Sequence, residues 1–261
     1  MEITLIQGIL LAVVAFICAL DSALEVFFWF RPMVVAFFAG IVLGDIELGC
    51  KAGAVAELSY MGMLSVGGTV PPNPLMAGMM TVVIAYTTGQ SVDTALGLSL
   101  PFALLAQWFG IFCNSSFAMF LEPLDKAAAA GDTKKYTSII LTSWAIVGFG
   151  YALMTFLSAY ALQGPIQEFV NNFPTWLVHG FEVAGGLLPA VGLTLLMVVM
   201  MKKENIAYLF LGFLMATFTN VGNILPVAIA GICVAFLGYL RDEQMKKVTV
   251  VADGGAEDDG I

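Results

Sequence analysis

Long runs of hydrophobic residues with few polar interruptions dominate the chain. The segment 136–163 carries no charged residue, and the segment 181–201 carries a single acid, Glu182. A helix needs about 20 apolar residues to cross a bilayer, and both runs meet that length. The pattern therefore predicts an all-α membrane protein with several membrane-spanning helices.

Two parts of the chain interrupt this pattern inside apolar sequence. An apolar helix is expected over 58–66, and three prolines at positions 71, 72 and 74 prevent its continuation. The next run, 75–86, is short for a full crossing. Residues 219–226 are rich in turn residues between two shortened helices. Each half is therefore expected to hold a broken or re-entrant helix, as in transporters that bind substrate near the midplane.

Basic residues are rare enough to indicate topology. They form three clusters: Lys126, Lys134 and Lys135; Lys202 and Lys203; and Arg241, Lys246 and Lys247. Positive residues near the ends of spans favour the cytoplasm, so all three clusters are expected to face inward. The loops 87–94 and 164–175 lack Lys and Arg and are expected to be external. Arg31 and Lys51 are too few to orient the first segment.

Composition excludes an ordinary soluble domain, because only 11% of the residues are charged, against about a quarter in such domains. The net charge of −9 includes four acids at the C-terminal end, where 248–261 is expected to be a disordered acidic cytoplasmic tail after a single membrane-embedded domain, 1–247. The acidic balance argues against a nucleic-acid partner. The four cysteines lack metal-ligand spacing, and no cofactor or metal motif is present in the sequence.

Glu57 is the polar residue with the strongest functional implication, because apolar sequence flanks it on both sides. A carboxylate at membrane depth costs roughly 2.5 to 3.5 kcal/mol and must face a cavity or a partner. Helical spacing puts Gly53, Glu57, Tyr60 and Met61 on one face. This arrangement favours binding of sugar hydroxyls, and a structural ion pair is the alternative.

Other polar residues carry weaker signals. Asn73, in the proline-rich break, can bind a hydroxyl or simply form a turn. Asp21 and Glu25 are expected to share a helix face, where Arg31 could neutralise one of them or mark a membrane boundary. The lone His179 fits an interfacial residue better than a catalytic one. Glycines 40, 44, 49 and 53 are expected to allow close helix packing within the chain.

Several segments together resemble one known family. They are Met1-Glu2-Ile3 with Gln7, Arg31-Pro32, residues 40–45, residues 57–62, Pro71-Pro72-Asn73, residues 184–186 and residues 211–213. Over nearly the full chain, this pattern is similar to the IIC subunit of the mannose-class sugar phosphotransferase systems.

The resemblance implies a multi-pass permease of the bacterial cytoplasmic (inner) membrane, in which a mobile core domain moves like an elevator against a scaffold. It implies a IID membrane subunit as partner, in a trimer of IIC–IID heterodimers. Soluble IIA and IIB subunits pass phosphate from phosphoenolpyruvate to the incoming sugar. The IIC chain then needs no cofactor, no catalytic residue and no phosphorylated residue of its own.

By the same resemblance, the sugar contacts fall at Gln7, Glu25, Glu57 and Asn73. Glu25 and Asn73 stand where some mannose-type members have Asp, and residues 53–57 depart from the commoner Gly-Gly-Thr-Leu-Glu, which leaves the hexose open. The Pro-Pro-Asn segment and the acidic end, 257–261, favour N-acetylgalactosamine or a related amino sugar. An ion-coupled secondary sugar transporter is the alternative, and a non-transporting scaffold or receptor subunit is a third possibility.

Overall fold

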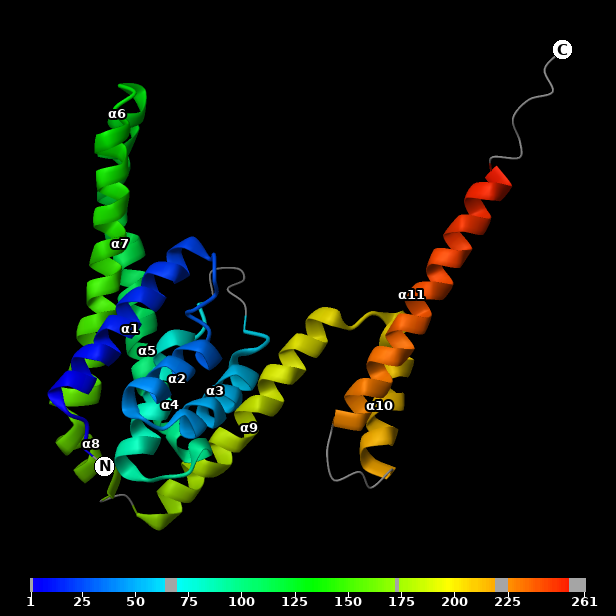
Figure 1. Ribbon diagram of the computed structural model, residues 1–261, viewed down its shortest axis with the longest axis horizontal. Helices are drawn as coiled ribbons and strands as arrows, with labels where there is room; N and C mark the ends of the chain where they lie inside the picture. Colours follow the sequence, from blue (N-terminus) through cyan, green and yellow to red (C-terminus); the bar gives the residue numbers. More distant parts are fainter. Residues whose placement is uncertain (1, 64–69, 172–173, 219–224, 254–261) are drawn as a thin grey trace. The chain divides into compact units, whose positions relative to one another are not determined.

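The computed structural model describes residues 2–63, 70–171, 174–218 and 225–253 (Figure 1). Within these ranges the regular structure is entirely helical. Four helical segments are long and apolar enough to cross a membrane: Leu5–Leu24, Val92–Ala129, Thr133–Ala161 and Thr175–Met200. The prediction of an all-α membrane protein is confirmed.

The chain divides into two compact units, Met1–Val199 and Met200–Ile261. The first unit holds α1 (Leu5–Leu24), α2 (Pro32–Leu43), α3 (Ile46–Tyr60), α4 (Pro74–Thr88), α5 (Val92–Ser116), η1 (Phe117–Phe120), α6 (Leu121–Ala129), α7 (Thr133–Phe156), η2 (Leu157–Ala161), α8 (Gln163–Asn171) and nearly all of α9 (Thr175–Met200). The second holds η3 (Lys203–Asn205), α10 (Ile206–Phe218) and α11 (Leu225–Asp253).

Helix α1 lies antiparallel along the end of α7. Gly8 approaches Tyr160 so closely that an added Cβ would lie 2.7 Å from the tyrosine Cβ, and Gly148 lies against Phe16. The side chain of Gln163 accepts a hydrogen bond from the backbone N–H of Ile3 at 2.7 Å and donates one to its carbonyl at 2.9 Å. These contacts hold the start of α1 at the C-terminal end of the helical segment Thr133–Ala161, away from Lys126, Lys134 and Lys135.

Helix α1 ends at Leu24, because Glu25 adopts the left-handed conformation with φ of 50°. The buried Asp21 carboxylate then accepts hydrogen bonds from the backbone N–H groups of Phe27 (3.0 Å) and Trp29 (2.6 Å). Glu25 is exposed. The expectation that Asp21 and Glu25 share a helix face was wrong: the chain turns between them, and Asp21 shapes the turn.

Helices α2 and α3 pack with their backbones in contact. A Cβ added at Gly40 would lie 2.9 Å from the Gly49 Cα, a distance that only glycine allows. The sharp turn between the helices uses Gly44 at φ of 80° and Asp45 as the N-cap of α3. The predicted packing role within the chain is confirmed for Gly40, Gly49 and Gly53, whereas Gly44 has no close neighbour and serves the turn.

Helix α4 forms the centre of the first unit. Twelve of its 15 residues are buried, and α2, α3 and α5 surround it (Figure 1). The proline-rich segment starts this helix. Pro74 is its first residue, where proline is tolerated because an N–H at this position has no partner within the helix. Asn73 caps the helix. The predicted short helix after the break is confirmed. The helix before the break was expected to reach residue 66, but α3 ends at Tyr60; residues 64–69 lie outside the described part.

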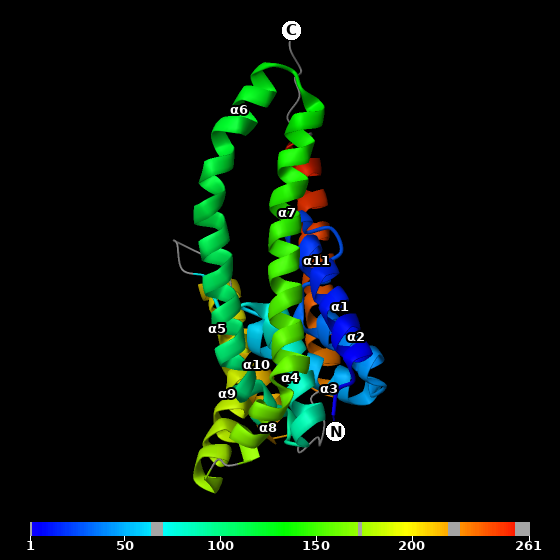
Figure 2. The ribbon, with the colours of Figure 1, turned by 90° about the vertical axis from the view of Figure 1, so that its left-hand side faces the viewer.

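Helices α5 and α7 form the legs of a long hairpin closed by α6 (Figure 2). Val92–Ala129 has 38 residues and Thr133–Ala161 has 29. At 1.5 Å per residue these helical segments measure about 57 and 44 Å, well beyond the roughly 30 Å of a hydrocarbon core. The surplus length lies at the α6 end, which carries the Lys126 cluster.

In the second unit, α10 ends at Phe218 and α11 begins at Leu225. The two helices flank the break expected in this region; residues 219–224 lie outside the described part. The apolar portion of α11, Leu225–Arg241, is shorter than a full span, and the helix continues to Asp253. The division into one membrane domain and a tail from residue 248 stays a prediction, and residues 254–261 also lie outside the described part.

Candidate functional site

The ion pair between Glu57 and Arg31 joins the end of α3 to the start of α2. The Arg31 guanidinium donates to Glu57 Oε1 through Nε at 2.7 Å and also through Nη2. The other carboxylate oxygen, Oε2, accepts the backbone N–H of Met33 at 3.3 Å. The Glu57 side chain is 17% exposed and that of Arg31 35%. Glu57 therefore has the ion pair that the sequence left open as an alternative. Its partner is Arg31, for which the sequence had left open a pairing with Asp21 or Glu25 or a place at a membrane boundary.

Local structure explains why the carboxylate lies there. Helix α2 begins with Pro32, which has no N–H, and its N-cap Arg31 makes no side-chain cap. Glu57 supplies the cap from the neighbouring helix, and the helix dipole favours a negative charge at this end. One turn earlier, Gly53 lets α3 approach, since an added Cβ would lie 3.0 Å from the Met33 Cα. Gly53 and Glu57, two residues of the predicted face of α3, are thus directed at α2, whereas Tyr60 packs with Ala77 of α4 and Ala103 of α5.

The Glu57–Arg31 ion pair retains hydrogen-bonding positions for a ligand. A carboxylate offers about four acceptor positions, and three are used by Arg31 and Met33. The guanidinium has five N–H groups, and its Nη1 is not engaged with Glu57. A hydroxyl could therefore donate to Glu57 Oε2, and an oxygen acceptor could bind Arg31. This combination suits a polyol.

Asn73 is anchored at three atoms. Its Oδ1 accepts the Met76 N–H at 3.0 Å, its Nδ2 donates to the Tyr151 hydroxyl at 2.7 Å, and its backbone N–H donates to the Ala103 carbonyl at 3.0 Å. The turn and cap role, weighed as an alternative in the sequence, is present in the structure. The Nδ2 group retains one further hydrogen for a ligand.

Asn73 is joined through Tyr151 to the second hairpin leg, ten residues before that leg ends at Ala161, which is about 15 Å along the helix. Helices α2, α3 and α4 have 12, 15 and 15 residues, so each measures about 18 to 23 Å and falls short of the roughly 30 Å of a full crossing. These lengths fit the expected re-entrant helices.

The structure brings two of the four predicted sugar contacts to ends of neighbouring helices: Glu57 lies near the end of α3, and Asn73 caps the start of α4. Glu25 caps the end of α1, a helix long enough to cross a membrane. Gln7 is at the opposite end of α1, about 27 Å from Glu25 along the helix. Its Oε1 accepts the N–H of Thr4 at 3.0 Å, and its Nε2 reaches the Val42 carbonyl at 3.5 Å. In this conformation one sugar does not span Gln7 and Glu25.

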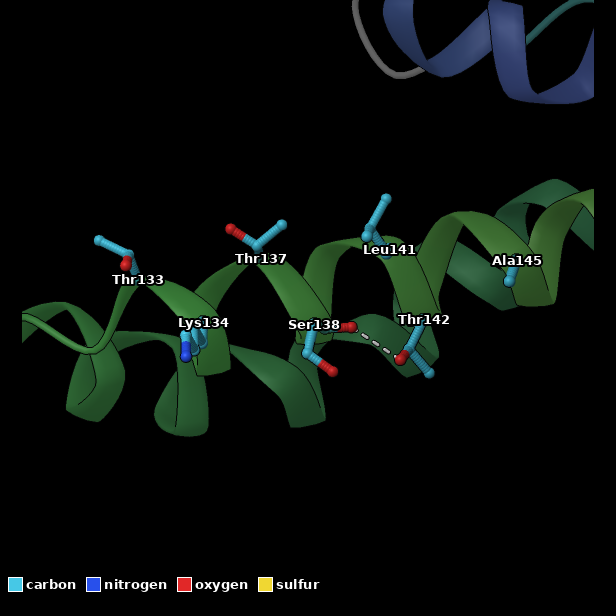
Figure 3. A pocket seen from close by; sticks show the side chains of 7 residues that line it. All are labelled: Thr133, Lys134, Thr137, Ser138, Leu141, Thr142 and Ala145. Atoms are coloured by element: carbon cyan, nitrogen blue, oxygen red, sulfur yellow. Dashed lines mark hydrogen bonds between the residues drawn. The ribbon is translucent and has the colours of Figure 1, made fainter.

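A separate groove runs along the first turns of α7 (Figure 3). Its volume is about 610 Å³. The residues that line it are Thr133, Lys134, Thr137, Ser138, Leu141, Thr142 and Ala145. The Thr142 hydroxyl donates to the Ser138 carbonyl at 2.7 Å, as the figure shows. The groove contains no carboxylate and none of the predicted sugar contacts.

Sequence reasoning did not identify two features of this region. Glu57 was not considered as the partner of Arg31, and Tyr151 was not singled out at all. Both depend on contacts between distant segments, Arg31 with Glu57 and Tyr151 with Asn73. A proline-rich break followed by a capped helix was the one local signal, and it indicated where such contacts would converge.

Comparison with known proteins gives a consistent result. The family model described as the sorbose-specific IIC component of a phosphotransferase system matches residues 5–237. The chain is 44% identical over 260 residues to N-acetylgalactosamine permease IIC component 1 of Escherichia coli K12, covering 99% of this chain and 97% of that protein. It is 28% identical over 238 residues to the mannose-specific EIIC component of the same strain, covering 91% and 89%.

Two solved structures match at 28% identity, each covering 92% of this chain and 97% of the other. One, described as a membrane protein, matches with a TM-score of 0.81. The other, a cryo-electron microscopy structure of the mannose transporter ManYZ with microcin E492, matches with a TM-score of 0.60. The same architecture is therefore found in solved membrane proteins.

Proposed function

This chain belongs to the family of sugar phosphotransferase IIC components, multi-pass permeases of the inner membrane, and from that premise we propose that it conducts an N-acetylgalactosamine-type amino sugar. The observation that carries the sugar assignment is the 44% identity, over 99% of the chain, to a relative named as an N-acetylgalactosamine permease. The relatives named for mannose are 28% identical.

The geometry supports a sugar site at the ends of the re-entrant helices. Glu57 keeps one acceptor position, Arg31 keeps donors, and Asn73 keeps one amide hydrogen. All three lie at ends of helices that are too short to cross a bilayer alone, which supports a site formed by α2, α3 and α4 within the membrane. Glu25, at the C-cap of α1, would supply a second carboxylate if the turn after α1 reaches the bound sugar. Gln7 would join the site only after a rearrangement, or act at the entrance beside Val42.

Phosphorylation on the cytoplasmic side gives the transport its direction. A IIB partner, recharged by IIA from phosphoenolpyruvate, phosphorylates the sugar as it leaves the permease, and the charged product cannot return through the site. A IID membrane subunit completes the transporter as a trimer of heterodimers, and the re-entrant helices move as the mobile core. The IIC chain contributes binding and passage, and the phosphoryl group is carried by its partners.

The direct test uses inner-membrane vesicles that contain this chain with its IID, IIB and IIA partners. Phosphoenolpyruvate should drive phosphorylation of N-acetylgalactosamine, and a protonophore should leave the rate unchanged. Uptake that needs no phosphoenolpyruvate and stops with the protonophore would instead establish an ion-coupled transporter.

Variants test the site. Glu57→Gln should lower the rate of sugar phosphorylation at least tenfold, because a neutral amide offers a weaker acceptor to hydroxyls and loses the Arg31 pair. Glu47→Gln is the matched control, since Glu47 lies on the same helix, is 77% exposed and pairs only with Lys51 in an i,i+4 bridge. Normal activity in Glu57→Gln would remove this residue from the site.

A further inference from the structure

Among the described residues of the first unit, two buried side-chain polar atoms have no hydrogen-bond partner. They are the hydroxyl oxygen of Tyr60 and the amide oxygen Oε1 of Gln107. The Tyr60 side chain is 4% exposed. A buried polar atom without a partner costs about 1–3 kcal/mol, and a native protein usually has a reason to retain one.

The two atoms belong to one neighbourhood. Tyr60 packs with Ala77 of α4 and Ala103 of α5, and Met63 packs against this cluster. Gln107 lies one turn after Ala103 on α5, so it shares the face of the helix that Tyr60 contacts. Tyr60 also lies three residues after Glu57 on α3, which places the neighbourhood beside the proposed sugar site.

The proline-rich segment crosses the same face of α5. Gln107 Nε2 donates to the Val70 carbonyl at 2.5 Å, and the Asn73 N–H donates to the Ala103 carbonyl at 3.0 Å. The amide nitrogen of Gln107 is therefore occupied by the backbone. Its oxygen is left as an acceptor directed at no other group of the protein.

We propose that Tyr60 and Gln107 form the subsite for the acetamido group of an N-acetylated hexosamine, an inference that rests on the proposed function. An acetamido group has one N–H donor, one carbonyl acceptor and one methyl. The Gln107 oxygen accepts from the N–H, and the Tyr60 hydroxyl donates to the carbonyl. Ala77 and Ala103, both fully buried, provide small apolar neighbours for the methyl.

In this structure neither atom reaches solvent, so the subsite is closed. The sugar occupies it only in a conformation in which the end of α3 or the segment 70–73 has moved. A movement of this kind accords with transport by re-entrant helices, since the binding groups must become accessible during the cycle.

The test measures KM for N-acetylgalactosamine and for galactosamine, which lacks the acetyl group, in the complete phosphotransferase complex. Tyr60→Phe should raise KM for N-acetylgalactosamine about fivefold and leave KM for galactosamine unchanged. Gln107→Leu should raise KM for both sugars, because both carry a nitrogen-bound donor. Tyr208→Phe, an exposed tyrosine of α10, should change neither.

The melting temperature provides a second test, because a Tyr60 hydroxyl with a structural role would give a different result. If the Tyr60 hydroxyl has no partner without sugar, Tyr60→Phe should keep or raise the melting temperature of the sugar-free protein. A lower melting temperature with unchanged KM would overturn the inference and assign the hydroxyl to a buried water or a protein partner. Equal KM changes for the two sugars in the Tyr60→Phe variant would also overturn it.

The two proposals fail in distinguishable ways. A wild-type complex that phosphorylates neither sugar refutes the proposed function, and the subsite falls with it. A wild-type complex that phosphorylates N-acetylgalactosamine, combined with a Tyr60→Phe variant that does not distinguish the two sugars, refutes the subsite alone.

Discussion

The pair of Glu57 with Arg31 allows a quantitative test of what holds the end of α3 to the start of α2. Removing one partner of a fully buried ion pair costs about 3 to 5 kcal/mol, because the other charge is left without compensation. Here the side chains are 17% and 35% exposed, so water replaces part of the lost interaction. Glu57→Gln also weakens the cap on Met33. We therefore expect Glu57→Gln to lower the free energy of unfolding by about 2 kcal/mol.

A double-mutant cycle separates the pair from other effects. Arg31→Gln combined with Glu57→Gln leaves no uncompensated charge, so the double variant should be more stable than the sum of the single effects by about 1–2 kcal/mol. The cycle on Lys51 and Glu47 is the control, since these side chains are 65% and 77% exposed. Exposed i,i+4 pairs are worth about 0.5 kcal/mol or less.

The assay is unfolding in mixed micelles titrated with sodium dodecyl sulfate, followed by tryptophan fluorescence. A coupling energy for Glu57 and Arg31 no larger than that of the control pair would refute this account of the site. Transport by the double variant then separates structure from function. If the double variant regains stability but not sugar phosphorylation, the Glu57 carboxylate binds the substrate. If the double variant regains both, Glu57 serves to cap α2.

Three further predictions concern the surrounding packing and use the same titration. Gly49→Ala should lower the free energy of unfolding by about 1 to 3 kcal/mol, because the added Cβ would lie 2.7 Å from a backbone oxygen of α2. Gly164→Ala, where an added Cβ has nothing within 4 Å, should be nearly neutral. Equal effects of the two substitutions would contradict the close approach of α2 and α3. Asn73→Ala should cost more than Asn73→Asp, since aspartate keeps the α4 cap and loses only the bond to Tyr151; the reverse order would show that the cap contributes little. Gln163→Leu should cost about 1–3 kcal/mol through the loss of both bonds to the backbone of residue 3, and an unchanged midpoint would mean that α1 is held by apolar packing alone.

The sequence was sufficient for the class of fold and for the position of the helix breaks, because bilayer length and proline act locally. The start of α4 at Pro74 followed from three prolines and a capping Asn. The end of α3 was predicted too late, because the prediction ended the helix at the prolines. Gly62, directly after the C-cap Met61, was the local signal for the earlier end. Glu25 lacked such a signal, because its left-handed backbone depends on the turn that Asp21 organises.

Site chemistry was predictable only as far as single residues imply it. An acid within apolar sequence needed a partner, and that much was clear for Glu57. The identity of the partner depended on how α2 and α3 pack, which the glycines allow without specifying. Gln7 illustrates the opposite case: it was grouped with Glu25 by the family resemblance, and the length of α1 separates the two in space.

The cap of α4 and its backbone hydrogen bond to α5 have a consequence for membrane insertion during synthesis. The backbone at the start of this helix is satisfied partly by the Ala103 carbonyl, which belongs to a helix that leaves the ribosome later. Until α5 has been synthesised, the segment 70–74 would present unpaired backbone groups to hydrocarbon, a state that lipid does not tolerate. Insertion of α4 must therefore wait for its successor in the chain, so nascent chains that end before α5 should leave α4 outside the bilayer interior.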